Sequence, residues 1–398
     1  MGAAALEHCR CHRQARWVPF APSPPAGSCK GAQQVYYSHG SGLVYAGIGK
    51  QVAHSAATGQ PRDTYEGHVG PVTCLMVTFC PHLQCDVLLS GSVDSTVKCW
   101  VLGHRQPRTF VGHTGAVWGL AASSTSFYSC SSDCTIRQWC RKSCKELMVL
   151  RGHAGPVQQL LFLEGTLCSG SEDGVLKVWG ENGQLLCSLE DHEDGITCML
   201  CALSEDIITG SRDCTLKCWN VKSGKLIDTM YGHTDWVTCL LEVEDSWWSG
   251  SRDTTIKRWH PITHQLLTTL QGHCSGISIL CYMSESILSG SADRTITQWH
   301  PKFQTQLASI DGMGGVSSLV EVATGIFRLA ARGPPRLLAK PRCPDSGADS
   351  KSELYELRCR PWPSQWPRAE FNFDSAACGE AFNEGTCWIS PKILEEQF

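Results

Sequence analysis

Histidine, serine and aspartate recur together along this chain at nearly constant spacing. Six histidines lie 39 to 45 residues apart; each is followed by an aspartate, with a serine two residues before the aspartate and a tryptophan six residues after it. These are the residue types of a hydrolytic triad, in which histidine removes the proton of a serine hydroxyl. The four sets are His68, His113, His153, His192, His233 and His273; Ser92, Ser131, Ser171, Ser211, Ser251 and Ser291; Asp94, Asp133, Asp173, Asp213, Asp253 and Asp293; and Trp100, Trp139, Trp179, Trp219, Trp259 and Trp299.

Six copies of one constellation indicate a structural role, because a single chain has no use for six identical triads. We predict that in each copy the aspartate accepts a hydrogen bond from the histidine, the histidine bonds the serine, and the serine receives the indole N–H. No P-loop, G-x-G-x-x-G or G-x-S-x-G motif occurs. We therefore expect no enzymatic activity and no catalytic residue.

The polar sets lie among alternating apolar residues that are typical of strands. From Thr209 to Trp219, two such runs flank a polar turn, which is the pattern of a β-hairpin. These residues resemble the WD-repeat (WD40) β-propeller family, whose signature is a repeat of about 40 residues with a Gly-His pair and a terminal tryptophan. This sequence departs from that signature at Asp191, which replaces the glycine, and after every tryptophan, where the usual aspartate is absent.

The resemblance implies an all-β fold, a seven-bladed β-propeller of four-stranded antiparallel blades. Six clear repeats fill residues 67–310, and four short strand-like runs at 33–66 are predicted to form a degenerate first blade. The propeller is thus predicted to span 33–310. Residues 1–32 are rich in proline and predict a flexible arm.

Residues 311–398 are predicted to be a partly ordered to disordered tail, because prolines interrupt most of this segment. Within it, Val316–Val322 and Ile326–Ala330 have the pattern of two more strands. They either begin an eighth blade or pair with the first one; we favour seven blades with an appendage.

Composition limits the partners. The 398 residues carry a net charge of −4, which argues against nucleic-acid binding and against an anionic membrane surface. No apolar run reaches the ~18 residues of a membrane-spanning helix, and no signal peptide is expected. The 24 cysteines are scattered through strand-like runs, so we predict structural thiols in a reducing, intracellular location, cytoplasmic or nuclear. The oligomeric state is left open.

Two short stretches contain residue types that bind metals. Four of them are His8, Cys9, Cys11 and His12, and a second group lies in 80–85 of the longest repeat. Neither has the paired spacing of a structural zinc site. We therefore expect incidental thiols, no metal and no cofactor.

In this family, two positions per repeat lie on one face of the ring, here named the top face. One precedes the turn aspartate. The other starts the first strand, at Thr73, Trp118, Gln158, Thr197, Thr238 and Ser278. Arginine and tryptophan are common in interaction hot spots. The predicted partner-binding residues are Arg212, Arg252, Trp236, Trp118, Glu172 and Gln158.

These residues favour a non-enzymatic protein–protein interaction scaffold that presents its top face to protein or peptide partners. Family members that read acidic or phosphorylated peptides use arginine at these positions, since its planar fork matches carboxylate and phosphate. The competing interpretation is that the arginines are merely solvated in a permissive loop. An alternative function is that of a substrate-receptor subunit of a ubiquitin-ligase complex, recruited through a separate adaptor.

Overall fold

The computed structural model describes residues 32–339, apart from 39–42, 57–60, 81–82, 84, 102–103, 105, 124–125, 164, 203–205, 244–245, 284–285, 303–304, 312–315, 323–324 and 331–335. The regular elements of this part are the strands β1 to β31. None of the described residues forms a helix long and apolar enough to cross a membrane. Residues 1–31 of the arm predicted at 1–32, and residues 340–398 of the tail predicted at 311–398, lie outside the described residues.

The first sixteen strands form four sheets. Their bounds are β1 Ala32–Ser38, β2 Leu43–Ile48, β3 Gln51–Ala56 and β4 Pro61–Glu66; β5 Val72–Cys80, β6 Cys85–Ser92, β7 Thr96–Val101 and β8 Arg108–Val111; β9 Val117–Ala122, β10 Ser126–Ser131, β11 Thr135–Cys140 and β12 Glu146–Arg151; and β13 Val157–Leu163, β14 Thr166–Ser171, β15 Val175–Trp179 and β16 Leu185–Glu190.

The other fifteen strands form four further sheets. Their bounds are β17 Ile196–Cys201, β18 Ile207–Ser211, β19 Leu216–Asn220 and β20 Lys225–Met230; β21 Val237–Val243, β22 Ser246–Ser251, β23 Ile256–Trp259 and β24 Leu266–Leu270; β25 Ile277–Met283, β26 Ser286–Ser291, β27 Thr295–Trp299 and β28 Gln306–Asp311; and β29 Val316–Val322, β30 Gly325–Ala330 and β31 Arg336–Ala339.

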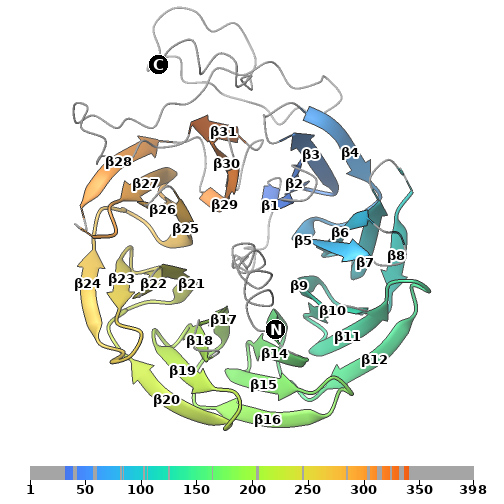
Figure 1. The fold of residues 1–398 in the computed structure, drawn as a ribbon, viewed down its shortest axis with the longest axis horizontal. Helices are drawn as coiled ribbons and strands as arrows, with labels where there is room; N and C mark the ends of the chain where they lie inside the picture. The colour runs from blue at the N-terminus through green and yellow to red at the C-terminus, as the bar shows by residue number, and fades with distance from the viewer. Residues whose placement is uncertain are drawn as a thin grey trace, which may run out of the picture.

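Each group of four consecutive strands is an antiparallel sheet in sequence order, which is one blade. The seven predicted four-stranded blades are therefore confirmed, and the segment at 33–66 supplies the first of them. The blades stand around an axis with their first strands innermost and their fourth strands on the rim (Figure 1). First strands of successive blades contact one another, as β5 contacts β9 and β9 contacts β13.

One further sheet, of three strands, extends the ring beyond the seven blades. Strands β29, β30 and β31 pair in order and lie between the seventh and the first blade (Figure 1). Strand β29 contacts both β25 and β1, so it takes the place of an innermost strand. The sequence left open whether the strands after residue 311 begin an eighth blade or pair with the first blade. They form a sheet of their own. The appendage that we favoured is instead part of the ring.

Most adjacent blades pack through a glycine on the second strand of one blade and a β-branched residue on the first strand of the next. A Cβ atom added to Gly210 would lie 2.7 Å from a methyl group of Val237, and one added to Gly250 would lie 2.7 Å from Ile277. Gly290 faces Val316 of β29 in the same way, at 2.5 Å. The eighth sheet therefore uses the same contact as the others.

Within most blades, the same glycine also faces a larger residue on its own first strand. Cys74 pairs with Gly91 across β5 and β6, and the equivalent pair in the fifth blade is Cys198 with Gly210. In the third blade, the sizes are exchanged, since Cys130 on β10 pairs with Gly119 on β9. One glycine per pair leaves room for one thiol.

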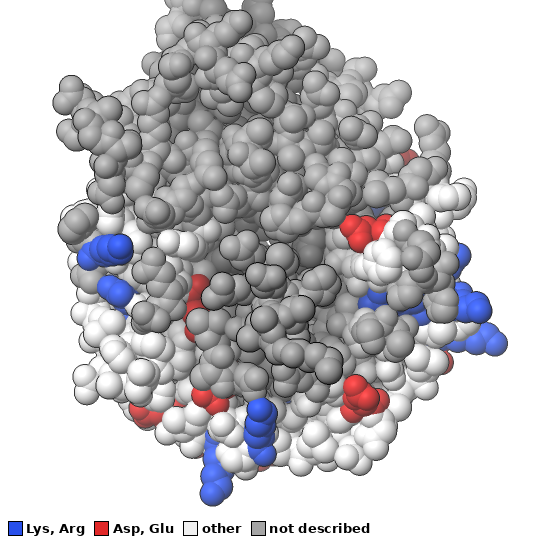
Figure 2. Space-filling view, in the orientation of Figure 1, with Lys and Arg blue, Asp and Glu red and all other residues white. Residues whose placement is uncertain are grey.

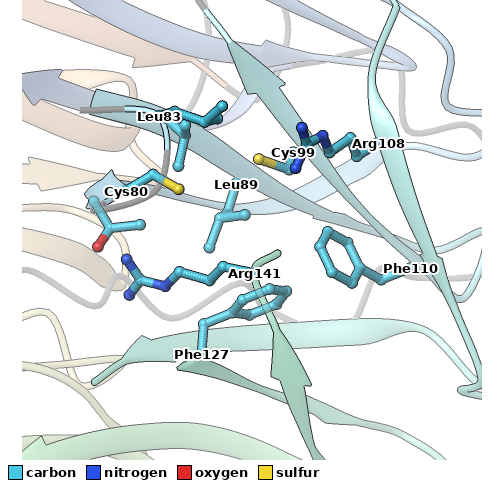
Figure 3. A pocket seen from close by; sticks show the side chains of 10 residues that line it. Cys80, Leu83, Leu89, Cys99, Arg108, Phe110, Phe127 and Arg141 are labelled. Atoms are coloured by element: carbon cyan, nitrogen blue, oxygen red, sulfur yellow. The ribbon is translucent and has the colours of Figure 1, made fainter. Parts of the chain in front are cut away.

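The longest repeat forms the β5–β6 hairpin, in which β5 ends at Cys80 and β6 begins at Cys85. Arg141 of the third blade is buried and holds this hairpin (Figure 3). Its guanidinium donates to the carbonyl of Phe79 at 2.5 Å and to the carbonyl of Ser123 at 2.7 Å. The adjacent cavity, between Cys80 and Phe127, has a volume of about 10 Å³, room for a single water at most. It is too small to hold a ligand.

Candidate functional site

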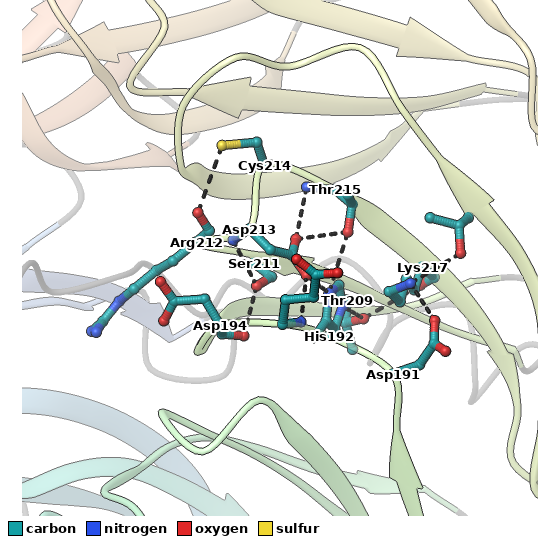
Figure 4. Close-up of polar contacts among 12 residues, drawn as sticks. Asp191, His192, Asp194, Thr209, Ser211, Arg212, Asp213, Cys214, Thr215 and Lys217 are labelled. Atoms are coloured by element: carbon teal, nitrogen blue, oxygen red, sulfur yellow. Dashed lines mark hydrogen bonds and ion pairs between the residues drawn. The ribbon is translucent and has the colours of Figure 1, made fainter.

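The histidine, aspartate and tryptophan of each of the six clear repeats come together in one network on the top face. Histidine Nδ1 lies 2.6–2.9 Å from an aspartate oxygen, and histidine Nε2 lies 2.6–2.8 Å from a hydroxyl oxygen. The same hydroxyl accepts the indole N–H of the repeat's tryptophan at 2.7–2.9 Å. Figure 4 shows His192, Thr209 and Asp213 of this network in the fifth blade.

The hydroxyl in the network is not the predicted serine but the residue two positions earlier. It belongs to Ser90, Ser129, Ser169, Thr209, Ser249 and Ser289. The predicted serines, Ser92, Ser131, Ser171, Ser211, Ser251 and Ser291, instead accept the backbone N–H of the turn aspartate, and five of them donate to the loop before the first strand. Both serines sit on one face of the second strand, because they are two residues apart.

A threonine that the sequence analysis did not single out completes five of the six networks. It follows the turn aspartate by two residues, and in the fifth blade Thr215 Oγ1 donates to Asp213 Oδ1 at 2.7 Å. Burial raises the pKa of Asp213, but the hydrogen bond and charge of His192, together with Thr215, outweigh it and hold that pKa well below its usual range. The signal was present in the sequence as the repeated D-x-T.

The network also accounts for the departure at Asp191. The carboxylate of Asp191 receives the ammonium group of Lys217 of the same blade (Figure 4). Equivalent lysines elsewhere donate to a hydroxyl group on the fourth strand, as Lys257 does to Thr269 at 3.0 Å and Lys177 does to Ser188 at 2.7 Å. The aspartate therefore adds an ion pair where the other repeats have glycine.

These hydroxyl groups cannot act as nucleophiles. All six network hydroxyl residues have 0% exposure, and each accepts an indole N–H while it bonds the histidine. A substrate carbonyl has no path to them. The network instead connects the turn that carries the aspartate to the second strand of the blade.

The residue before each turn aspartate is held on the top face in the same way in every clear repeat. Its backbone N–H donates to a carbonyl of the loop before the first strand of its own blade, at 2.9–3.0 Å. Three consecutive blades carry charged residues at this position: Glu172, Arg212 and Arg252. The predicted equivalence of these positions is thus visible in the backbone.

Trp236 connects two of the charged residues. It occupies the position where the fifth and seventh blades have Gly195 and Gly276, each of which packs against the charged residue of the blade before. The indole lies instead against Arg212 of the fifth blade, with the guanidinium carbon 4.7 Å from the ring centroid. The guanidinium carbon of Arg252 lies 3.8 Å from the same centroid. Cation–π contacts of this kind fix the orientation of a guanidinium.

A chain of polar contacts continues from Arg212 to the fourth blade. Arg212 Nη2 donates to Glu172 Oε1 at 2.5 Å, and Gln158 Nε2 donates to the same oxygen at 2.5 Å. We name the five residues Gln158, Glu172, Arg212, Trp236 and Arg252 the Trp236 array. It spans three adjacent blades and contains five of the six predicted partner-binding residues.

Trp118 is not one of the five residues that define the array. It packs, half-buried, against the core cluster of the third and fourth blades. Three other strand-start residues are buried rather than presented on the top face. Thr73, Thr197 and Thr238 each donate their hydroxyl to a backbone carbonyl of the first strand of a neighbouring blade. Hydrogen bonds from this first-strand position therefore connect neighbouring blades.

The charges on the visible face are mixed. Acidic and basic side chains are scattered around the described part of the ring, and several lysine and arginine side chains gather at its right edge in this view (Figure 2). Among the described residues, no three histidine, cysteine, aspartate or glutamate side chains lie together as metal ligands would. The stretch at 8–12 lies outside the described residues. Burial raises the pKa of Cys74 and Cys239 to about 12, so these thiols stay neutral.

A ring of four-stranded antiparallel blades fastened by His–Asp–hydroxyl–Trp networks defines a β-propeller. The WD40 family model (WD domain, G-beta repeat) matches residues 59–101, 104–140, 144–180, 183–220, 224–260 and 264–300, which is more than half of the chain. The chain belongs to the WD40 family.

Several proteins are similar to parts of it. Nuclear distribution protein nudF of Aspergillus niger is 37% identical over 128 residues, 30% of this chain and 28% of the relative. Apoptotic protease-activating factor 1 of Rattus norvegicus is 40% identical over 105 residues, 25% of this chain and 8% of the relative. Striatin-3 of Rattus norvegicus is 36% identical over 94 residues, which is 20% of this chain and 11% of the relative. The matches thus span well under two thirds of these relatives.

One solved structure is similar over most of the ring. The crystal structure of the computationally designed Ika8 protein superposes with a TM-score of 0.69 at 30% identity, covering 78% of this chain and 96% of that chain.

Proposed function

We propose that this chain is a non-enzymatic protein–protein interaction scaffold that binds an acidic or phosphorylated segment of a partner at the Trp236 array. The observation that carries the proposal is Arg252. Its guanidinium is stacked on Trp236, and within the described residues it has no acidic partner. A cation that is held in place but left unneutralised is suited to bind a carboxylate or phosphate.

The relatives and the buried histidine networks support the proposal of a scaffold rather than an enzyme. The relatives' names concern nuclear distribution in one case and apoptotic protease activation in another, so these proteins share the repeat and not one reaction. The histidine networks are closed and buried. Loops on a rigid ring are a common way to present binding residues.

The test compares the proteins captured from cell extract by the wild-type chain and by Arg212→Gln/Arg252→Gln. Neutral glutamine avoids placing a second carboxylate beside Glu172. Losing one well-formed charged contact costs about 2 kcal/mol, roughly 30-fold in affinity, so the main partners are expected to disappear. The matched control is Arg294→Gln, an exposed arginine in the top-face turn of the seventh blade that does not contact Trp236.

An unchanged set of partners for the double variant, at equal thermal stability, would overturn the proposal. Capture of ubiquitin-ligase subunits by wild type and by both variants would favour the substrate-receptor alternative, with the adaptor bound elsewhere.

A further inference from the structure

We infer that Glu172 is a built-in competitor for the partner's acidic group: it occupies Arg212 in the free protein and has to be displaced when a carboxylate or phosphate binds. The inference rests on the proposed function and adds to it how the same site is regulated. It is carried by the contacts of Glu172, by two buried polar atoms beside it and by the position of Arg252.

Glu172 already has the place that an acidic ligand would take on Arg212. One of its oxygens, Oε1, accepts from Arg212 Nη2 and from Gln158 Nε2, both at 2.5 Å. The side chains are shielded from water, with exposures of 26% for Glu172 and 14% for Arg212. Shielded ion pairs are screened less than surface ones, so the competition is appreciable.

The arrangement leaves hydrogen-bonding capacity unused. Arg212 Nε and Gln158 Oε1 are both buried and have no hydrogen-bond partner within the described part of the chain. Gln158 is 9% exposed, so Oε1 is not left to bulk water. Glu172 thus satisfies the arginine at Nη2 only, whereas a guanidinium can hold a carboxylate or phosphate through two parallel N–H groups. A ligand that used Nε as well would be the stronger partner.

Arg252 gives an incoming anion its first contact. It is exposed, and its guanidinium carbon lies 3.8 Å from the centroid of the Trp236 ring, while that of Arg212 lies 4.7 Å from the same centroid. Because both guanidinium groups pack against one indole, an anion held by Arg252 lies near the Arg212–Glu172 pair. Binding then exchanges one carboxylate on Arg212 for another, and Glu172 turns outward to water.

The experiment measures binding to an arrayed library of twelve-residue peptides with random sequence and one fixed central residue, either phosphoserine, aspartate or serine. Glu172→Gln keeps the size of the side chain and removes the competing charge. We expect it to bind the phosphoserine or aspartate pool roughly three- to tenfold more tightly than wild type, and the serine pool equally. The two acidic pools separate phosphate from carboxylate as the preferred group.

The matched control is Glu193→Gln, which makes the same charge change on the top face. Its side chain is exposed and forms no ion pair with either arginine in the described structure. Equal gains for both variants would show a general charge effect and overturn the inference. No gain for Glu172→Gln, with binding still lost in Arg212→Gln/Arg252→Gln, would overturn it while the proposed function stands. Acidic pools that bind independently of both arginines would overturn both.

Discussion

At the scale of single residues, each network holds its protons in one consistent order. The indole N–H donates to the buried hydroxyl, the hydroxyl donates to histidine Nε2, and histidine Nδ1 donates to the aspartate. In five of the six networks the aspartate also accepts the threonine hydroxyl, as Asp213 does from Thr215. With a neutral imidazole that carries its proton on Nδ1, every donor in the network has an acceptor. Burial agrees with this, since it lowers the pKa of His233 and of His273.

The aspartate is the member with the most partners, so its removal is the sharpest test of the structural role. Asp213 accepts from His192, from the backbone of Glu193 and from both the backbone and hydroxyl of Thr215. Asp213→Ala leaves these donors without a partner and is expected to lower the free energy of unfolding by about 1–3 kcal/mol, measured by urea denaturation.

The isosteric Asp213→Asn keeps one carbonyl acceptor and is expected to lose less. If Asp213→Ala unfolds at the same urea concentration as wild type but lacks an enzymatic activity that wild type has, the structural assignment is wrong.

The sequence predicted which residue types meet, but not every position. Two serines lie two residues apart on the same face of each second strand, so spacing could not decide between Ser249 and Ser251. The fifth repeat contains a clue, since a hydroxyl is retained at Thr209 although serine is not. Trp236 is a similar case: equivalent positions carry proline, alanine or glycine, and the contact of its indole with two arginines depends on how neighbouring blades meet.

At the scale of strands, a pair of positions across the first two strands of the second, third, fifth and sixth blades holds one cysteine and one glycine. The second blade has Cys74 opposite Gly91, and the third has Gly119 opposite Cys130. A Cβ atom added to Gly119 would lie 2.9 Å from the sulfur of Cys130 and 3.2 Å from the carbonyl oxygen of Gln158 in the fourth blade. The exchange conserves volume within the pair.

This predicts that a double substitution is tolerated better than one of its components. Gly119→Cys puts two thiols where one fits and is expected to cost about 1–3 kcal/mol of unfolding free energy. Adding Cys130→Gly restores the arrangement of the second blade and is expected to recover at least half of that loss. Thermal or urea unfolding of the two single variants and the double variant forms a mutant cycle. A double variant as unstable as the sum of both single ones would contradict the volume argument.

The strand pattern was the part of the fold that sequence periodicity predicted best, because the polar network repeats in register six times. The first blade was predicted from four short strand-like runs and the turns between them, since 33–66 has no histidine network, and β1–β4 confirm it. The repeat pattern did not predict the sheet β29–β31 as a member of the ring. Met313 stands where the next histidine would fall, and the third strand lies beyond a Gly-Pro-Pro that reads as the end of the repeat.

At the scale of the whole molecule, the question is what closes the ring. Val316 of β29 packs against the core of the seventh blade, in a cluster with Ile279, Leu288 and Ile296. The hydroxyl of Ser278 donates to the backbone carbonyl of Val316, as other first-strand hydroxyls do to the next blade. On its other side, β29 contacts β1, so the sheet bridges the last and first blades.

Two shortened chains test this closure. A chain that ends at Lys340 keeps every described strand and is expected to have the thermal midpoint of wild type, because the segment beyond it is rich in proline and lacks the repeat.

A chain that ends at Asp311 lacks β29–β31 and exposes the apolar residues that Val316 covers. Uncovering one such side chain costs about 1.5–3 kcal/mol, and its partners lose cover as well, so a lower midpoint and association of the opened edges are expected. Val316→Ala, which leaves the backbone in place, should give a smaller loss in the same direction. The readouts are differential scanning calorimetry and size-exclusion chromatography. A chain ending at Asp311 that stays monomeric with an unchanged midpoint would mean that the seven four-stranded blades close on themselves and that the three-stranded sheet is an insertion the ring can do without.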